Sequence, residues 1–600
     1  MGAGTGEEPV TAANIATEPV MAALEESMPQ SLARIPIIAA KASSQQSLHP
    51  ADNAIDVNKE TLWNSGANAP QWIEVELSGD YHLQEIRLLV AQYPNGPSFH
   101  RVFAAGQEKD YRLLTEFSGD TEDGQILTFQ AEQPSMVRFL KIETIKSPSW
   151  IAWKEIEVYG YPAQTEPGDS EEPVEQPDQT ADVIFINGSL LTMEESKPSA
   201  EAMAIYGQKI MAVGKNEEMS AFKGNETRVI DLKGKTLMPG FIDTHAHIFD
   251  RLGNSYQEAQ LISLQNGITS TAEFFVNQDI YDRLKDFENS GDQKMRVALY
   301  LAFNSSCGEV IGNWYEQYPP SRDPRDKMRV TGVKIYGDGG DCNIPAYSFD
   351  FPGLGKGDLY FEKDELVEVF RDADAKGYQI AIHTLGDRSL DVILDAYDEL
   401  LAGRDNPLRH RIEHNAVVRP DQMDRFWSNH LVISVFGAYP VCRRTDPVNP
   451  LKFIIPEEYE SWEWPYQSMI DANPSAVFVW QSDSPLFGLQ LISPINQLYG
   501  LAARAEIAED GHICQAPPGL YEESVEIEKA LKMMTIDAAY ALFLENEVGS
   551  LVPGKYADIV MLSENPLNMA AEDIHRLEVQ MTMVDGGTVF CGTTDQTLCP

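Results

Sequence analysis

Apolar and polar positions alternate in short runs between residues 35 and 161. Examples are the runs 71–77, 85–90 and 155–160, and turn residues separate one run from the next. Alternation with a period of two is typical of strands that bury one face. The pattern therefore predicts an all-β sandwich or jelly roll over 35–161.

Two polar stretches flank this segment. Residues 1–34 are acidic and rich in Ala and Pro, and they lack the basic and apolar regions of a signal peptide, so we expect a mobile N-terminal segment. Residues 162–181 are rich in Pro, Glu and Asp with almost no apolar content. Such a composition cannot bury enough surface to fold, which predicts a linker.

Beyond the linker, strand-like runs at 182–188 and 202–214 are mirrored near the C-terminus by runs at 549–562 and 581–587. They enclose one long central block. We therefore expect a small composite β-sandwich domain built from residues 182–239 and 544–600.

The central block, 240–543, alternates apolar strand-like runs with helical stretches such as 363–376 and 389–402. The eight strand-like runs are 240–247, 268–275, 296–302, 332–337, 379–383, 410–414, 431–436 and 476–483. Eight βα units over this length predict an α/β (β/α)8 TIM barrel. The active site of such a barrel lies at the C-terminal ends of its strands.

Composition narrows the range of partners. With 46 basic and 92 acidic residues, the formal net charge is −46, which argues against nucleic acid and anionic membrane. No run approaches the ~18 apolar residues of a membrane span. The six cysteines form no Cys-x-x-Cys pair; Cys591 and Cys599 bracket a short loop and could form a disulfide in an exported protein, with free thiols as the alternative.

Candidate metal ligands stand at the ends of the predicted strands. His245 and His247 follow a Pro-Gly turn and an apolar pair, and alternate residues of a strand share one face. Two imidazoles on one face are a ready pair of metal ligands, unless the motif is a chance feature of a surface turn. Lys334 lies within an apolar strand, where an amine is costly unless it is paired or chemically altered, for example by carbamylation.

The ligand order along the chain resembles that of the amidohydrolase superfamily, in the formamide-deformylase-like branch of amidohydrolase family 3 type. The resemblance covers about 182–590 and includes the lead-in 239–245 and the closing strand 549–560. It implies one or two divalent metals, most often zinc, on six residues: His245, His247 and Asp483 for the first, His383 and His414 for the second, and a carbamylated Lys334 as the bridge.

The resemblance also implies a mechanism. Asp483 would move a proton from the attacking water to the leaving amine, and Tyr336 or Tyr439 would help to stabilise the oxyanion. Arg388 would contact a substrate carboxylate or form an ion pair within the protein. Only 19 residues separate His247 from the next strand, which implies a more open substrate pocket than is usual in this branch.

The N-terminal β segment resembles the discoidin-like, coagulation-factor type C family of galactose-binding modules, through 42–44, 49–56, 61–65 and 153–160. The resemblance implies a structural Ca²⁺ bound by five residues: Asn53, Asp56, Asn58, Thr61 and Glu155. An Asx-rich turn without metal is the alternative. Candidates for contact with a glycan are Tyr93, Phe99, His100, Arg101 and Trp150, although aromatic residues are more often core.

Three interpretations remain open at this level. The first is a metal-dependent hydrolase of a small-molecule, non-peptide C–N bond, secreted, periplasmic or at the cell surface, whose N-terminal domain binds a glycan or another surface. The second keeps the metal site but attacks an ester, lactone or phosphoester. The third is a catalytically silent barrel that acts as a binding scaffold. A cytoplasmic location is the alternative to export.

Overall fold

The computed structural model describes residues 33–46, 49–56, 58–59, 61–106, 109, 111–162, 180–251, 255–340, 342–351, 353–437, 441–444, 455–485, 493–508 and 510–600. The chain divides into two compact units at residue 172, and each is treated by itself. Most of the predicted mobile segment and of the predicted linker lies outside the described residues, as does Tyr439.

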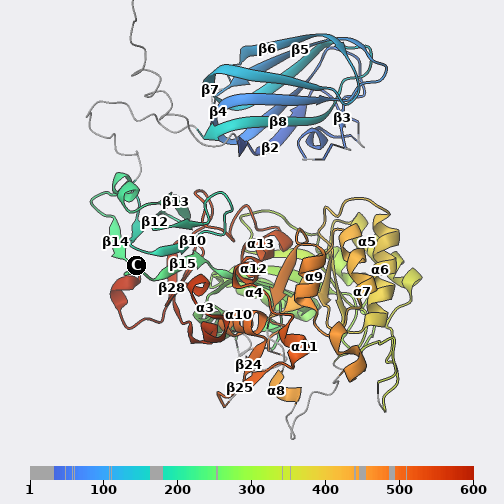
Figure 1. Cartoon of the computed structure of the whole chain (residues 1–600), viewed down its shortest axis with the longest axis vertical. Helices are drawn as coiled ribbons and strands as arrows, with labels where there is room; N and C mark the ends of the chain where they lie inside the picture. Colours follow the sequence, from blue (N-terminus) through green and yellow to red (C-terminus); the bar gives the residue numbers. More distant parts are fainter. Residues whose placement is uncertain are drawn as a thin grey trace, which may run out of the picture. The chain divides into compact units, whose positions relative to one another are not determined.

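The first unit is all β (Figure 1). Its strands are β1 (Ala33–Arg34), β2 (Ile37–Ala42), β3 (Trp63–Asn64), β4 (Gln71–Val90), β5 (Gly96–Ala105), β6 (Arg112–Thr121), β7 (Ile126–Lys146) and β8 (Ala152–Pro162). All of their pairings are antiparallel, in the order β1-β8-β4-β7-β5-β6, with β2 on β4 and β3 on β8. The predicted all-β, discoidin-like domain is confirmed.

Alternation along these strands builds the core of the first unit. The long strand β4 pairs with β2 over its first half and with β8 over its second half, so one strand serves both parts of the fold. Trp63 of β3 lies opposite Trp153 of β8, and both side chains are buried. The inward-facing apolar positions of β4 pack on the same cluster, as expected for strands with one buried face.

The second unit contains a small β domain with two sheets. One sheet has the order β13 (Lys209–Gly214), β12 (Ala202–Tyr206), β9 (Val183–Ile186) and β14 (Arg228–Asp231). The other has the order β11 (Ser199–Ala200), β10 (Ser189–Leu191), β15 (Thr236–Pro239), β26 (Ile559–Leu562), β27 (Val579–Val584) and β28 (Gly587–Cys591). The antiparallel pairing of β15 with β26 joins segments from both ends of the unit, so the predicted composite domain is present.

The barrel consists of eight parallel strands that occupy the predicted runs. They are β16 (Phe241–Ala246), β17 (Ile268–Val276), β18 (Arg296–Ala302), β19 (Met328–Tyr336), β20 (Gln379–Thr384), β21 (Arg411–His414), β22 (Val432–Phe436) and β23 (Phe478–Gln481). Hydrogen bonds between the first and last strands close the barrel, for example from the Asp483 amide to the His245 carbonyl at 2.9 Å. The predicted TIM barrel is confirmed.

Helices lie between the strands (Figure 1). They are α2 (Ile248–Arg251), α3 (Tyr256–Gln265), α4 (Gln278–Ser290), α5 (Lys363–Ala375), α6 (Asp387–Leu401), α7 (Pro420–Ser428), α8 (Val441–Arg444), α9 (Tyr466–Ala472), α10 (Pro494–Ala503), α11 (Pro518–Tyr521), α12 (Ile527–Met533) and α13 (Ile536–Ala541). A short hairpin, β24 (Ala505–Ile507) with β25 (Ile513–Gln515), follows α10. Helix α6 buries Leu390, Ile393, Leu394 and Tyr397, the spacing of a helix with one apolar face.

Buried ion pairs join the N-terminal ends of the barrel strands to the C-terminal part of the chain. Arg296, at the start of β18, donates to Asp558 at 2.8 Å and to Asp585 at 2.6 Å. Arg329, near the start of β19, forms a two-pronged pair with Glu547 at 2.6 and 2.8 Å. Each charge has a partner, as buried charges require, and this end of the barrel is therefore structural.

All six cysteines are paired, so the free-thiol alternative is wrong. The disulfides are Cys307–Cys342, Cys442–Cys514 and Cys591–Cys599. Short spacing suggested only the last pair, because the others are 35 and 72 residues apart and meet only in the folded chain. Among the helices described above, none is both long and apolar enough to cross a membrane.

Candidate metal centre

Three predicted ligands meet where the first and last barrel strands end. His245 is on β16, His247 follows it, and Asp483 follows β23. The Asp483 Oδ1 atom lies 3.5 Å from His245 Nε2 and 3.3 Å from His247 Nε2. All three side chains are buried, and their donor atoms lie within 4.8 Å of one another, close enough to share one cation.

Lys334 reaches the same place from β19. Its Nζ atom is 3.4 Å from His245 Nε2, and the rings of Phe274 and Tyr336 lie 5.0 and 4.5 Å from the nitrogen. The lysine is fully buried. An amine between imidazoles and aromatic rings fits the expectation that this position carries a chemical role.

His383 and His414, from β20 and β21, complete the group of predicted barrel ligands. Their ring centroids are 4.5 Å apart, and the His414 ring is 4.8 Å from that of His245. His383 Nε2 donates to the Gly339 carbonyl at 3.1 Å. Its buried Nδ1 has no hydrogen-bond partner in the part of the chain that the structure describes. That nitrogen therefore keeps its lone pair available for a ligand.

Two of these residues have a strained backbone. His414 has a φ of 75° and Asp483 a φ of 51°, both in the left-handed region. For residues other than glycine this conformation costs about 1–2 kcal/mol, less for Asp and Asn. Strained backbone conformations are concentrated at functional sites. Here the two residues with this conformation are both predicted ligands at the ends of barrel strands.

Burial favours the neutral form of three imidazoles of the site, those of His245, His383 and His414. Desolvation, reinforced by the charge of Lys334, lowers the pKa of His383 to about 3. The pKa values of His245 and His414 are also lowered well below their usual range, first by desolvation. Neutral imidazole is the form that binds metals, so the site is ready for ligation at neutral pH.

A carboxylate that the sequence analysis overlooked orients His245. The His245 Nδ1–H donates to Glu413 Oε2 at 2.9 Å, which leaves Nε2 facing Asp483 and Lys334. Glu413 is held in turn by Arg411, whose Nη2 donates to the same oxygen at 2.9 Å. A carboxylate on the second nitrogen of a histidine is the usual support of a metal ligand. Glu413 directly precedes His414 at the end of β21, and this place beside a predicted ligand was the available signal.

Two further buried carboxylates stabilise the strand ends. Asp243 accepts hydrogen bonds from the hydroxyl and amide of Ser482, so it ties β16 to the end of β23. Glu273 of β17 accepts from the amides of Phe249 and Asp250 at 3.1 and 3.0 Å, which fixes the turn just after His247. Both hold the backbone on either side of the predicted ligands.

The remaining predicted residues lie around this group. The ring of Tyr336 is buried 5.0 Å from that of His383. Arg388 Nη2 donates to the Gly357 carbonyl at 2.6 Å, whereas Asp387 pairs with Arg419 at 2.8 Å. An Arg388–Asp387 ion pair is therefore not the arrangement found, and a substrate contact by Arg388 stays a prediction.

His410 directly precedes β21, the strand that ends in His414, but its own hydrogen bonds go to other residues. Its Nδ1 accepts from the Ile380 amide at 3.0 Å, and its Nε2 bonds to Asp374 at 3.1 Å. The side chain within hydrogen-bond distance of His414 is that of Gln481, whose amide lies 3.0 Å from His414 Nδ1. An amide can present either its oxygen or its nitrogen there, and with the oxygen inward it would accept Nδ1–H and free Nε2.

The donor set fits a transition-metal site. Four imidazoles, a carboxylate and a lysine lie together in a buried space, and nitrogen and oxygen ligands of this kind suit zinc and related ions. His383 Nδ1 is a buried polar atom without a hydrogen-bond partner among the described residues, and a cation could bind its lone pair. These residues therefore fit a divalent metal of the kind that the resemblance implies.

The predicted calcium loop of the first unit also assembles in part. Thr61 Oγ1 lies 2.8 Å from the Asn58 carbonyl, 2.8 Å from an Asp56 carboxylate oxygen and 3.4 Å from the Asn53 carbonyl. Four of the five predicted ligands are thus gathered around one point. For Glu155 the structure shows a salt bridge to Arg34 at 2.6 Å. Calcium binding stays a prediction.

A cavity of about 580 Å³ opens among the loops of the first unit. Two of the predicted glycan contacts line it, Tyr93 and Trp150, and their side chains are 90% and 49% exposed. His100 is buried and bonded to Ser98 and Thr144, so it is a core residue and not a contact. Arg101 pairs with Glu116, and neither it nor Phe99 lines this cavity.

Comparison with known proteins agrees with this architecture. The model of the F5/8 type C domain matches residues 39–156. Protein LONG AFTER FAR-RED 3 of Arabidopsis thaliana is 32% identical, over 68% of this chain and 92% of that protein. The N-substituted formamide deformylase of Arthrobacter pascens is 27% identical, over 38% of this chain and 39% of its own length.

Solved structures share the barrel fold. An uncharacterized metal-dependent hydrolase from Pyrococcus horikoshii OT3 superposes with a TM-score of 0.52 at 19% identity, covering 65% of this chain and 99% of that one. The model of the amidohydrolase family matches residues 250–590, a range that includes Lys334, His383, His414 and Asp483. The chain belongs to the amidohydrolase family.

Proposed function

We propose that the second unit is a metal-dependent hydrolase of a non-peptide, amide-type C–N bond in a small molecule. One observation carries this proposal: six buried side chains lie at the ends of five barrel strands, and three of them, His245, His247 and Asp483, have donor atoms within 4.8 Å of one another. A barrel that served only as a scaffold would gain nothing from a buried lysine between imidazoles. The formamide deformylase among the relatives is named for a reaction at an amide.

The proposed ligands divide between two positions. His245, His247 and Asp483 would hold one divalent ion, zinc in our proposal, and His383 and His414 a second, with carbamylated Lys334 between them. Such ions supply a hydroxide nucleophile at neutral pH and polarise the scissile carbonyl. The short separations among His245, Asp483 and Lys334 support one shared centre.

The protein's own groups would then move the protons. Asp483 is held by its backbone to β16 and points its Oδ1 at both imidazoles of the His-x-His motif. From that place it can take the proton of the attacking water and deliver it to the departing amine. Tyr336 would stabilise the oxyanion, a role supported by its ring lying 5.0 Å from the His383 ring and 4.5 Å from Lys334 Nζ.

Metal content and turnover test this proposal together. We expect purified protein to carry one or two zinc-like ions by elemental analysis, and Lys334→Ala to lose at least one of them. Wild-type protein should hydrolyse members of a panel of N-acyl amines. Esters with the same acyl groups, and phosphoesters, are tested beside the amides, because the same hydroxide can attack them. The class that is hydrolysed fastest identifies the bond that the enzyme cleaves. If the protein binds no transition metal even when the metal is supplied, the hydrolase proposal is refuted and the interpretation as a binding scaffold remains.

We further propose that the first unit binds a glycan through its exposed aromatic pair, and that the protein works outside the cytoplasm. Flat aromatic faces beside polar loop groups suit the mixed surface of a sugar ring, and three disulfides suit an oxidising compartment. Trp150→Ala and Tyr93→Ala should weaken retention on a galactose-containing affinity gel, while Arg101→Ala, outside the cavity, should not. Equal retention of all three variants would contradict the assignment.

A further inference from the structure

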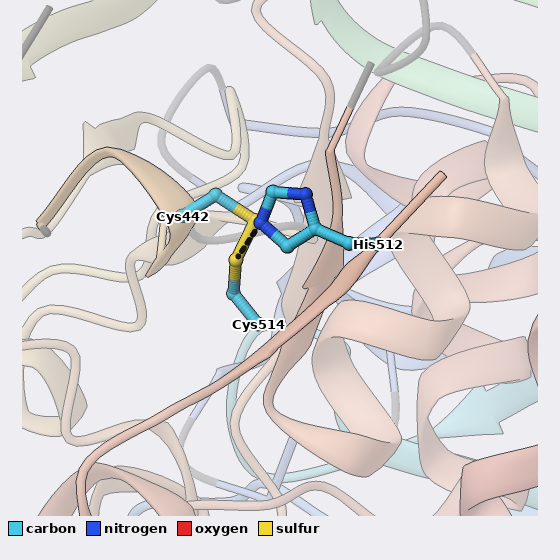
Figure 2. A group of neighbouring side chains, drawn as sticks. All are labelled: Cys442, His512 and Cys514. Atoms are coloured by element: carbon cyan, nitrogen blue, oxygen red, sulfur yellow. Dashed lines mark hydrogen bonds between the residues drawn. A yellow bond between two sulfur atoms is a disulfide. The ribbon is translucent and has the colours of Figure 1, made fainter. Parts of the chain in front are cut away.

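A second group of metal-binding side chains lies apart from the barrel ligands. Cys442 belongs to α8, which follows barrel strand β22, and His512 and Cys514 belong to the hairpin of β24 and β25. Their donor atoms lie within 4.8 Å of one another, and His512 Nε2 is 3.1 Å from Cys514 Sγ. Figure 2 shows the imidazole directed at the sulfur pair.

We propose that these three side chains form a second metal site, which binds one thiophilic divalent cation of the Zn²⁺ class once the Cys442–Cys514 disulfide is reduced. The site is independent of the barrel centre and of the reaction proposed for it. In the oxidised chain the same residues hold a disulfide, so bond and metal are alternative ways of joining α8 to the hairpin.

The orientation of His512 supports a ligand role. Its Nδ1 is bonded to Asp510 Oδ1, so Nε2 keeps the lone pair that faces Cys514. A carboxylate on the far nitrogen is the support that metal-ligating histidines use. His512 directly precedes β25 and Cys514 is the second residue of that strand, so the two are alternate residues whose side chains both reach the Cys442 sulfur.

Cys442 approaches the same point from α8, and contacts with β24 hold it there. Its amide donates to Glu506 Oε2 at 2.6 Å, and its sulfur is 3.7 Å from the Glu506 carbonyl, which anchors α8 on β24. Two thiolates and an imidazole are a common zinc ligand set. Since all three residues are at least partly exposed, a fourth position is open to solvent.

The chemistry balances with one named reductant. A dithiol gives two electrons and two protons to the Cys442–Cys514 bond, becomes a disulfide itself, and leaves two protein thiols. Binding of the divalent cation then releases both thiol protons as the sulfurs ligate. Zn–S and Zn–N bonds of about 2.3 and 2.0 Å need donor atoms less than 4 Å apart, so only small side-chain movements are required.

The Cys307–Cys342 disulfide provides an internal control. Both of its cysteines are exposed, as His512 is. Within the described ranges, however, groups of potential ligands were found only at Cys442–His512–Cys514 and at the barrel centre. Reduction of Cys307–Cys342 should therefore create thiols without a metal site.

Cobalt binding tests the proposal. Full-length protein, reduced with a dithiol that is then removed under nitrogen, is titrated with Co²⁺ alone. Thiolate-to-cobalt charge transfer in the near ultraviolet reports sulfur ligation only, so the sulfur-free barrel centre is silent in that band. We expect one thiolate-bound Co²⁺ per chain, and no band before reduction.

Variants assign the ligands. The double variant Cys442→Ser/Cys514→Ser should lose the band, and Cys307→Ser/Cys342→Ser should keep it. His512→Ala, which leaves the disulfide able to form, should weaken binding by more than the roughly 10-fold expected for Asp510→Asn. The proposal is overturned if reduced wild type shows no band or unfolds, if His512→Ala binds as tightly as wild type, or if the Cys307→Ser/Cys342→Ser variant loses the band.

Discussion

Replacing Glu413 with glutamine should weaken metal binding at the barrel centre without touching a ligand. The carboxylate accepts the Nδ1–H of His245 at 2.9 Å and is bonded by Arg411, and all three side chains are fully buried. Glutamine has nearly the same shape, so no cavity forms. What is lost is the negative charge that makes His245 a stronger ligand and neutralises Arg411.

Two magnitudes follow from this geometry. Loss of a carboxylate behind a metal-ligating histidine costs roughly 10–100-fold in metal affinity, or about 1.4–2.7 kcal/mol. Removing one partner of a buried ion pair costs about 3–5 kcal/mol of folding free energy, because Arg411 stays charged. Glu413→Gln should therefore lower both metal affinity and thermal stability.

A matched control separates the two effects. Glu547 is also buried and also pairs with an arginine, Arg329, at 2.6 and 2.8 Å, but at the opposite end of the barrel. Glu547→Gln should lose comparable stability and keep wild-type metal affinity. Affinity is measured by competition with a chromophoric chelator, and stability by urea unfolding of the metal-free chains. If Glu413→Gln and Glu547→Gln bound metal equally tightly, the orienting role of Glu413 would be refuted.

Three further predictions follow from other parts of the structure. Desolvation lowers the pKa of buried His100 to about 4. Between about pH 6.5 and 4 the unfolded state, in which this pKa is near 6.5, binds a proton that the folded state does not, so wild type should lose up to about 3 kcal/mol of unfolding free energy relative to His100→Gln as pH falls through this range. Urea unfolding at several pH values measures this loss, and parallel pH profiles of the two proteins would contradict the prediction. Removing the Cys442–Cys514 disulfide, which spans 72 residues, should lower the unfolding free energy by about 4.4 kcal/mol, against about 2.5 kcal/mol for Cys591–Cys599, which spans 8. If Cys591–Cys599 contributed more, loop entropy would not be what determines the stabilisation by these disulfides. Stripping metal with a chelator should lower the melting temperature, because an ion at 1,000 times its Kd adds about 4.1 kcal/mol to the folded state, and Lys334→Ala should show a smaller shift on the same treatment.

Local pattern was enough to predict the barrel and the places of its candidate ligands. Parallel strands buried on both faces are continuous apolar runs, so a histidine, lysine or aspartate at the end of such a run is conspicuous. His383 and Asp483 could therefore be picked out from their own neighbours. Because all strand ends of one barrel meet at one face, residues far apart in sequence could be expected to converge.

Contacts between distant, unexceptional residues could not be predicted in this way. Glu413 bonds to a histidine 168 positions away, and its place directly before His414 does not reveal that distant partner in this strongly acidic chain. The pairing of Cys307 with Cys342 depends on which loops the barrel brings together. His100 was suggested as a surface contact because of its type, whereas its position on the buried face of β5 decides its environment.

The two ends of the barrel show why the position of a buried charge matters more than its presence. At the N-terminal end, Arg296 and Arg329 have carboxylate partners at hydrogen-bond distance, and such closed networks hold neighbouring layers in one arrangement. At the C-terminal end, His383 Nδ1 is buried without a partner among the described residues, and His414 and Asp483 have strained backbones. The buried arginines at the N-terminal end are paired, so the unpaired His383 Nδ1 at the C-terminal end is best explained by a ligand that completes its bonding.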